Sequence, residues 1–373
     1  MIYLDHAATT PMRPGVREAM EPYLTDVFGN PSGVHEVSRR GKNALEDARE
    51  RIAALIGARP MEIVFTSGGT ESDNLAIKGP VKSSTARHGV VTVATEHDAV
   101  LETVYHLKRS GYPLTIVGVD EQGAIDPDEL KAVIDNDTAV VSVMSANSET
   151  GVVPDLPRMV TAVKDIDPEV LFHTDAVQAF NSEPVNVDGV DLMTLAAHKL
   201  GGPKGVGILY VREGVPLEPV IHGGGHELGR RSGTQNVAGA VGMATAMELA
   251  DADRDRFRSV VGGIRDDFEK RLLAVIDDAV VNGVNRTSNH LNMRFPGVRN
   301  QTLLLRLDRA GVAASAGSAC QSGAAKVSHV LESMGLTPDQ ARECLRFSFG
   351  WDTTVDEAAE AASIVTELVG ELR

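Results

Sequence analysis

Seven short apolar runs occupy the first two-thirds of the chain, and segments with helical spacing of apolar residues separate several of them. The runs are rich in Val, Ile and Leu and do not alternate strictly between apolar and polar residues. This pattern is typical of strands covered on both faces, as in a parallel sheet. The predicted strands are residues 62–67, 89–95, 113–119, 139–146, 169–176, 190–198 and 205–211.

The segments between the strands indicate how the sheet is covered. Residues 44–57, for example, place apolar side chains at helical spacing and end at Gly57, a residue that commonly terminates helices. The alternation of strands and helices predicts an α/β fold with an open, mostly parallel sheet. Ligands of such sheets bind beyond the carboxyl ends of the strands.

The pattern of apolar and polar residues changes after about residue 237. Residues 237–275 predict one long helical region, or two helices broken near Gly262 and Gly263. We expect a smaller α+β domain attached through this helix, so that residues 14–246 form a large domain and residues 1–13 and 247–373 a small one. The expected elements of the small domain are a strand at 291–297 and helices at 302–311 and 354–372.

Composition and charge narrow the class of protein. The 373 residues include 36 Lys and Arg against 52 Asp and Glu, and the net charge of −16 argues against binding to a nucleic-acid backbone. No apolar stretch is long enough for a membrane span, and the N-terminal residues lack the pattern of a secretory signal. Two cysteines are too few for a disulfide framework. We therefore expect a cytoplasmic enzyme.

The first candidate for chemistry is the segment 66–74, which follows a predicted strand. Its glycines and Thr70 precede a helix, and the free N–H groups and positive dipole of a helix N-terminus attract anions. An ordinary glycine-rich helix cap has the same appearance, so both interpretations stay open.

Two charged residues also follow predicted strands. Asp175 is either a helix cap or the counter-ion of a protonated cofactor ring. Lys199 lies among small residues, where shielding from water makes a lysine amine nucleophilic toward a carbonyl. By spacing alone, Lys204 is a rival for that role, and either lysine could instead lie at the surface.

The two cysteines have different surroundings. Cys320 lies in a run of Ala, Ser and Gly, which packs poorly and predicts an accessible loop suited to a reactive thiol. Cys344 lies beside Leu345 and is expected to be inert core. His222 and His226 are four residues apart, but the glycines between them argue against a helical zinc site, so no metal site is expected.

Together these features suit pyridoxal 5'-phosphate (PLP) chemistry coupled to a thiol, and the chain resembles the cysteine desulfurases. These enzymes belong to the class-V aminotransferase family and include bacterial iron–sulfur assembly and nitrogen-fixation enzymes. The resemblance runs almost end to end. The motifs that carry it are YLDHAATTP (3–11), GNPSGVHE (29–36), EIVFTSGGTESDNLAIKG (62–79), TEHDAVL (95–101), HTDAVQA (173–179), AHKLGGPKGVGILYV (197–211), HGGGHELGRRSGT (222–234), SAGSACQSG (315–323) and LRFSFG (345–350).

The resemblance implies the fold of PLP-dependent transferases of fold type I, with a seven-stranded sheet, and a role for each matching residue. Lys199 would bind PLP covalently, His97 would stack on its ring and transfer protons, and Cys320 would become the persulfide. Asn30 and Arg346 would bind the substrate carboxylate. The implied cofactor-binding residues are Gly69, Thr70, His97, Ser148, Asp175, Gln178, His198, Lys199 and, from the second subunit of a homodimer, Thr234.

Two positions depart from the family pattern. Ser148 stands where an asparagine is usual, and Ala196 stands where a phosphate-binding serine is usual. A hydrogen bond to a charged group contributes roughly 1.5–3 kcal/mol, so we expect weaker retention of PLP without loss of the chemistry. Gln321, where threonine is commoner, is a further difference beside Cys320.

The resemblance thus implies removal of sulfur from L-cysteine, which yields L-alanine and an enzyme persulfide. The persulfide would pass to an acceptor protein in iron–sulfur cluster assembly or thiolation, and in the family the matching cysteine also contacts iron–sulfur clusters transiently. The alternatives are an aminotransferase, a selenocysteine lyase or another carbon–sulfur lyase on the same scaffold. A non-catalytic member of a sulfur-relay assembly is a third hypothesis.

Overall fold

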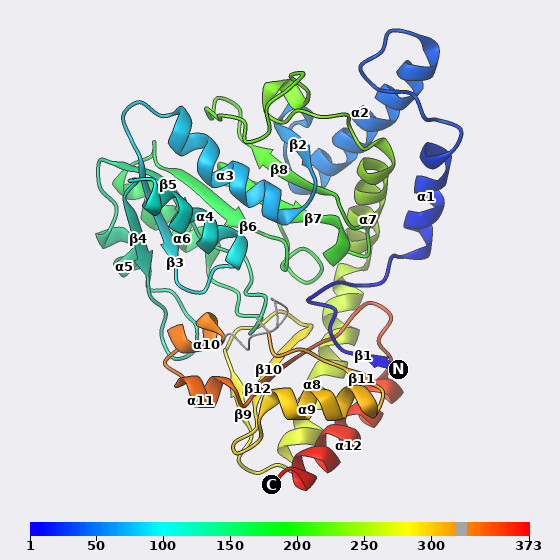
Figure 1. Cartoon of the computed structure of the whole chain (residues 1–373), viewed down its shortest axis with the longest axis vertical. Coiled ribbons are helices and arrows are strands. Elements are labelled where there is room, and N and C mark those ends of the chain that lie inside the picture. The colour runs from blue at the N-terminus through cyan, green and yellow to red at the C-terminus, as the bar shows by residue number, and fades with distance from the viewer. Residues whose placement is uncertain (318–326) are drawn as a thin grey trace.

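The computed structural model describes residues 1–317 and 327–373. Its largest sheet has seven strands in the order β2-β8-β7-β6-β5-β3-β4, and β8 is antiparallel to both of its neighbours while the other pairs are parallel (Figure 1). The predicted α/β class is therefore confirmed. The strands are β2 (Ile63–Thr66), β3 (Gly89–Val93), β4 (Leu114–Val117), β5 (Thr138–Ser142), β6 (Leu171–Asp175), β7 (Leu192–Ala196) and β8 (Gly207–Val211).

Each of the seven predicted runs coincides with one of these strands, although several runs continue past the strand end. After β5, for example, Val143 and Met144 remain buried as the chain leaves the sheet. Because buried residues of a loop are apolar like those of the strand before it, the sequence does not show where the strand ends. The ends of the strands were therefore predicted less well than the strands themselves.

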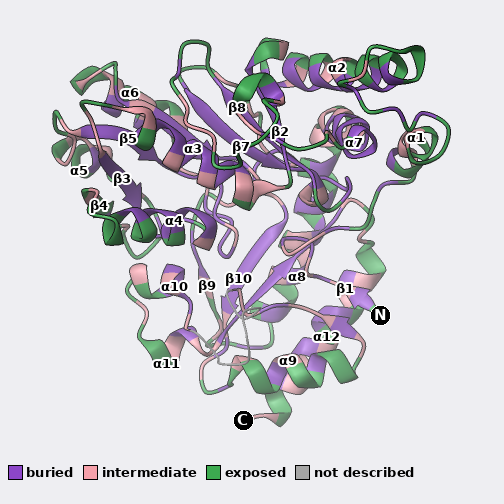
Figure 2. Ribbon diagram, turned by 45° about the horizontal axis from the view of Figure 1, so that its top comes forward, coloured by how far each residue is buried: buried purple, intermediate pink, exposed green. Residues whose placement is uncertain are grey.

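Helices cover both faces of this sheet. One apolar core joins α1, α2, α6 and α7 to one face, and two smaller cores join α3 and α4 to the other. Figure 2 shows the buried strands between helices whose outer sides are exposed. The helices of this region are α1 (Pro14–Leu24), α2 (Glu36–Ile56), α3 (Gly69–Ser83), α4 (Asp98–Arg109), α5 (Pro127–Ala132), α6 (Leu156–Ile166) and α7 (Val237–Arg256).

Helix α2 begins eight residues before the segment predicted from residue 44, so that boundary was wrong. The buried positions of its first turns include Ser38 and Gly41, which give no apolar signal. His35 caps the helix by accepting a hydrogen bond from the Ser38 N–H. At the other end Gly57 adopts a left-handed conformation (φ 73°), as predicted for a helix terminator.

A second core contains residues from both ends of the chain, including Ile2, Leu4, Phe268 and Phe347. We therefore propose residues 1–13 and 247–373 as the smaller domain (Figure 1). Its strands are β1 (Ile2–Tyr3), β9 (Val280–Asn282), β10 (His290–Arg294), β11 (Val312–Ala313) and β12 (Cys344–Ser348), with β1 parallel to β11 and β12-β10-β9 antiparallel. Its helices are α8 (Gly262–Leu273), α9 (Asn300–Arg309), α10 (His329–Ser333), α11 (Pro338–Ala341) and α12 (Val355–Glu371).

The helical region predicted for 237–275 runs through α7 and α8. A π-helical turn, Phe257–Val261, joins the two helices immediately before Gly262, close to the predicted break. Among the helices of the described residues, none combines the length and the apolar character needed to cross a membrane.

Candidate active site

A cavity of about 350 Å³ opens at the carboxyl ends of the central strands, between the large sheet and the second core. Its volume lies within the range of about 300–1,000 Å³ that is usual for small-molecule sites. Most of the predicted site residues meet here although they are far apart in the sequence. The predicted residues that line the cavity are Gly69, Thr70, His97, Ser148, Asp175, Gln178, His198, Lys199 and Arg346.

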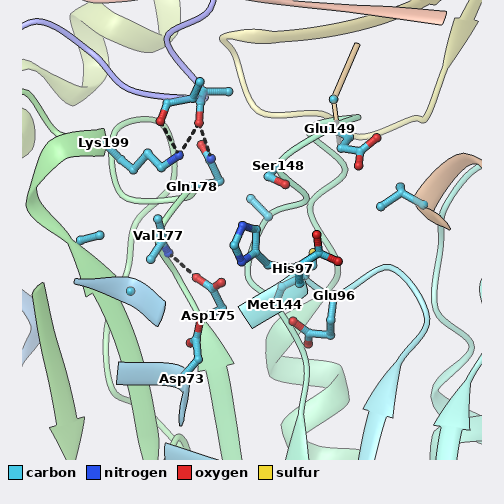
Figure 3. A pocket seen from close by; sticks show the side chains of 18 of the residues that line it. Asp73, Glu96, His97, Met144, Ser148, Glu149, Asp175, Val177, Gln178 and Lys199 are labelled. Carbon is cyan, nitrogen blue, oxygen red and sulfur yellow. Dashed lines mark hydrogen bonds between the residues drawn. The ribbon is translucent and has the colours of Figure 1, made fainter. Parts of the chain in front are cut away.

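Lys199 lies at the end of β7, in a single 3-10 turn, Ala197–Lys199. Its Nζ donates hydrogen bonds to the carbonyl oxygens of Ala7 and Ala8, in the segment after β1 (Figure 3). Burial, and to a smaller extent the charge of Arg346, lowers the pKa of Lys199 to about 8. Lys204 is exposed and does not line the cavity, so the structure separates the two rival lysines.

Asp175 ends β6, and its Oδ1 accepts a hydrogen bond from the Val177 N–H at 2.9 Å (Figure 3). A carboxylate oxygen of Asp73, a ring nitrogen of His97 and a carboxylate oxygen of Asp175 all lie within 4.8 Å of one another. Burial raises the pKa of Asp175. Because an isolated buried carboxylate is costly, this arrangement favours a bound cation against Asp175.

Two further buried carboxyl groups, Asp73 and Glu96, line the cavity together with Asp175. Burial, followed by repulsion from Asp175, raises the pKa of both groups well above the usual range. Burial thus disfavours the charged form of both groups. A single Asp in a helix or Glu in a turn gives no local signal of such burial, and the sequence analysis missed both.

The N-terminus of α3 forms another wall of the cavity. Gly68 precedes it with φ 151°, and Gly69 begins it. A Cβ on Gly69 would lie 3.2 Å from Val177 Cγ2, so a larger residue here would require Val177 to shift by a few tenths of an ångström. Thr70, in the first turn, also lines the cavity. Free N–H groups at a helix N-terminus form a site for a phosphate.

His198 lies beside this site. Burial, together with the charge of Lys199, lowers the pKa of His198 to about 4, so its ring is neutral at neutral pH. Its Nδ1 is 3.2 Å from the hydroxyl of Thr9. A neutral ring can donate one hydrogen bond to an anion without adding charge.

Arg346 projects from β12 in the smaller domain. Its Nη2 donates to Asp5 at 2.7 Å and its Nη1 to the carbonyl oxygen of Ser148 at 2.8 Å. Among the described residues, its buried Nε has no hydrogen-bond partner. Two contacts therefore hold the guanidinium in place at the wall of the cavity, where its charge attracts a carboxylate.

Two predicted residues lie outside the cavity, and a third is not among the described residues. Asn30 and Thr234 are exposed and do not line the cavity of their own chain. Cys320 lies outside the described residues, so its role stays a prediction from the sequence. The flanking residue Gly317 and the nearby His329 do line the cavity.

The cavity also contains residues that the sequence analysis did not single out. The carbonyl oxygen of Ala7 accepts hydrogen bonds from both Lys199 and Gln178. Glu149 accepts a hydrogen bond from the Ser328 hydroxyl at 2.6 Å. The motif 3–11 contains Ala7, but backbone carbonyls and tertiary burial cannot be recognised from single residues.

With this geometry in view, the relatives of the chain are informative. The family model of the class-V aminotransferases matches residues 2–360. A "Cysteine desulfurase IscS" from Dictyoglomus turgidum is 43% identical over 377 residues, which cover 100% of this chain and 95% of the relative.

Two solved structures are also similar. One, a "NIFS-LIKE PROTEIN", has a TM-score of 0.93 and 34% identity over 99% of both chains. The other, "SspA in complex with cysteine", has a TM-score of 0.82 and 34% identity over 94% of this chain and 99% of its own. The chain belongs to the class-V aminotransferase family.

Enzymes of this family depend on PLP, and the cavity fits that cofactor. Lys199 offers an amine with a lowered pKa, Asp175 a buried carboxylate for the ring nitrogen, and the N-terminus of α3 a site for the phosphate. When bound, PLP withdraws electrons from the α-carbon of an amino acid.

The lowered pKa of Lys199 predicts how the rate of covalent PLP binding depends on pH. Only the neutral amine attacks a carbonyl, and for a pKa of about 8 its fraction rises as pH rises through that value. The rate at which cofactor-free protein binds added PLP covalently should therefore increase between pH 7 and 9 and level off above. Stopped-flow absorbance measures this rate. A rate that is independent of pH over this range would contradict the assignment.

The position of Ala196 predicts the effect of a substitution on the affinity for PLP. Its Cβ lies 3.8 Å from the position of a Cβ on Gly69, beside the N-terminus of α3. A hydroxyl placed there by Ala196→Ser should bind the PLP phosphate, and a contribution of about 1.5–3 kcal/mol lowers the Kd roughly 10- to 150-fold. Equilibrium dialysis measures the Kd. Pyridoxal without the phosphate is the control, and an equal gain for pyridoxal would show that the hydroxyl does not act on the phosphate.

Proposed function

We propose that this protein is a cysteine desulfurase, which moves one sulfur atom from L-cysteine to a protein thiol and releases L-alanine. The reaction balances without an outside oxidant or reductant, because the thiol gains the sulfur atom that the substrate loses. The observation that carries the proposal is a single cavity in which Lys199, Asp175 and the α3 N-terminus face Arg346 of the smaller domain. The cysteine desulfurase relative that matches the whole chain supports the same activity.

In the proposed reaction, the Arg346 guanidinium at the wall of the cavity binds the substrate carboxylate. Lys199, as a neutral amine, takes the proton from the substrate α-carbon at Nζ. Asp175 keeps the cofactor ring nitrogen protonated. Gln178, whose Nε2 donates a hydrogen bond to the Ala7 carbonyl oxygen, orients the cofactor.

The sulfur acceptor in this proposal is Cys320. Attack of its thiolate on the substrate sulfur forms an S–S bond while the Cβ–S bond breaks, so the enzyme is left as a persulfide. A reactive cysteine distinguishes this reaction from that of an aminotransferase, which needs no thiol. The persulfide then passes to an acceptor, either an iron–sulfur scaffold or a thiolation partner.

We also propose that the protein is a homodimer. The α1–α2 connection and the segment 220–234 expose large apolar side chains, including Phe28 (76% exposed), Val34 (90%) and Leu228 (61%). Contiguous exposed apolar side chains mark interaction surfaces, and we propose that the partner subunit covers these residues. Thr234, exposed at the end of the second segment, would then reach the phosphate site of the partner subunit. Light scattering should give twice the chain mass of 39.6 kDa.

The experiment that tests the function compares products from L-cysteine. A cysteine desulfurase releases L-alanine and, with added thiol, an equal amount of sulfide. An aminotransferase would instead need an α-keto acid and would leave the sulfur on the product. A rate with L-selenocysteine far above the rate with L-cysteine would favour the selenocysteine lyase alternative.

A further inference from the structure

A continuous chain of five buried polar side chains crosses the large sheet beside the cavity. Its two ends are carboxyl groups that line the cavity, Glu96 after β3 and Asp73 in α3. Between these ends lie Ser142 in β5, His173 in β6 and Thr194 in β7, on neighbouring strands. Each of the five residues is at most 1% exposed, so their hydrogen bonds are made within the protein and not to bulk water.

Each link of this chain is a contact between two side chains. The Ser142 hydroxyl lies 3.4 Å from Glu96 Oε1 and 2.9 Å from His173 Nδ1. The Thr194 hydroxyl lies 3.1 Å from His173 Nε2 and also forms a side-chain hydrogen bond with Asp73. Asp73 Oδ1 itself is 3.6 Å from His173 Nε2, which is too far for a direct hydrogen bond, so Thr194 is the link between them.

The number of hydrogen atoms fixes the direction of all four links together. Each hydroxyl has one hydrogen, and a neutral imidazole has one N–H. If the His173 proton is on Nδ1, Ser142 donates to Glu96 and Thr194 donates to Nε2. Asp73 must then be a protonated acid, because it has to donate to Thr194. If the ring proton is on Nε2, every link is reversed, and Glu96 must be the protonated acid.

The chain therefore holds one proton at its two carboxyl ends. If both carboxyl groups were ionised beside a neutral ring, one link would contain two acceptors and no hydrogen. A second proton would lie on Glu96 Oε2 or Asp73 Oδ1, two buried atoms that have no hydrogen-bond partner among the described residues. Burial, followed by repulsion from Asp175, raises the pKa of both carboxyl groups, and burial lowers the pKa of His173 to about 3. Both directions agree with a neutral ring and a retained carboxyl proton.

We propose that these five residues form a proton relay, which carries one proton between Asp73 and Glu96. In one direction, the Asp73 O–H bond breaks as Thr194 takes the proton and passes its own hydroxyl proton to His173 Nε2. The Nδ1–H bond then breaks as Ser142 takes that proton and passes its own to Glu96. The ring proton has then changed from Nδ1 to Nε2, and the transfer consumes no oxidant, reductant or water.

The relay adjusts the charge beside Asp175. A carboxylate oxygen of Asp73 lies within 4.8 Å of one of Asp175, and Figure 3 shows the Glu96 side chain apart from both. In the cofactor-free protein, repulsion from Asp175 favours protonated Asp73 and thus the Nδ1–H form of the ring. A cation held by Asp175, such as the protonated ring nitrogen of PLP, stabilises ionised Asp73 and drives the proton to Glu96. This inference concerns PLP binding alone and does not depend on the fate of the sulfur.

Nitrogen-15 NMR of the His173 ring reports the position of its proton, and His173→Gln assigns the signals. Thr194→Val removes the partner of Nε2, so the neutral ring should keep its proton on Nδ1 and donate to Ser142. Ser142→Ala removes the partner of Nδ1, so the proton should be on Nε2. The same tautomer in both variants would overturn the proposal, because the two hydroxyls would then not set the direction of the links.

The wild-type protein tests whether the proton moves. We expect its ring-nitrogen shifts to move toward the Ser142→Ala values when PLP is added, with binding followed by absorbance. Thr194→Ser keeps the hydroxyl, and Thr92→Val removes a buried hydroxyl that donates to the Ser142 carbonyl oxygen outside the relay, so both controls should respond as the wild type does. Wild-type shifts that PLP leaves unchanged, or moves toward the Thr194→Val values, would overturn the proposal.

Discussion

Lys199→Ala should form alanine from L-cysteine at least about 10⁴-fold more slowly than the wild-type protein. The substitution removes both the amine that binds PLP covalently and the base at the α-carbon, and the other lysine of this segment cannot take over. The visible band of the covalently bound cofactor should be absent as well. Absorbance spectra of purified protein and a chromatographic assay of alanine measure the two effects.

Lys204→Ala is the matched control. Lys204 is five residues away but exposed and outside the cavity, so this variant should keep its colour and its rate. If Lys204→Ala lost the cofactor while Lys199→Ala kept it, the assignment of the two lysines would be wrong.

The second large effect is expected for Cys320→Ala. This variant keeps all the described residues of the cavity, so it should bind PLP and show the wild-type spectrum. It lacks the proposed sulfur acceptor, so sulfide and alanine release should fall to background. Release of both products at the wild-type rate would show that Cys320 does not accept the sulfur and would favour a lyase that shares the cofactor site.

Cys344→Ser is the control for Cys320→Ala. Burial raises the pKa of the Cys344 thiol to about 12, and its Sγ lies 3.3 Å from the Gln340 carbonyl oxygen and from Asn282 Nδ2. Such a thiol is a poor nucleophile. We therefore expect Cys344→Ser to keep the rate of alanine release, with any loss confined to stability.

The sheet could be predicted because its signal is local. Strands buried on both faces appear as apolar runs, and each of the seven runs forms a strand. The start of α2 was missed because Ser38 and Gly41, two of its first buried positions, are small and give no amphipathic pattern. The arrangement of the sheet, in which β8 is antiparallel to its neighbours, depends on connections that periodicity does not report.

The site residues that could be predicted are those whose residue type and position after a strand indicate a chemical role. Lys199, Asp175 and the glycines before α3 each follow a strand, and they meet at one cavity. Asp73 and Glu96 were not predictable, because their effect depends on burial in the folded chain and on the charge of Asp175.

The most direct test of the central claim is the mass of the intact protein after reaction with L-cysteine in the absence of other thiols. We predict a gain of the mass of one sulfur atom per chain, located by peptide mapping on Cys320, together with one equivalent of L-alanine. Alanine or pyruvate formed without any gain in protein mass would contradict the account, because the sulfur would then leave without passing through an enzyme persulfide.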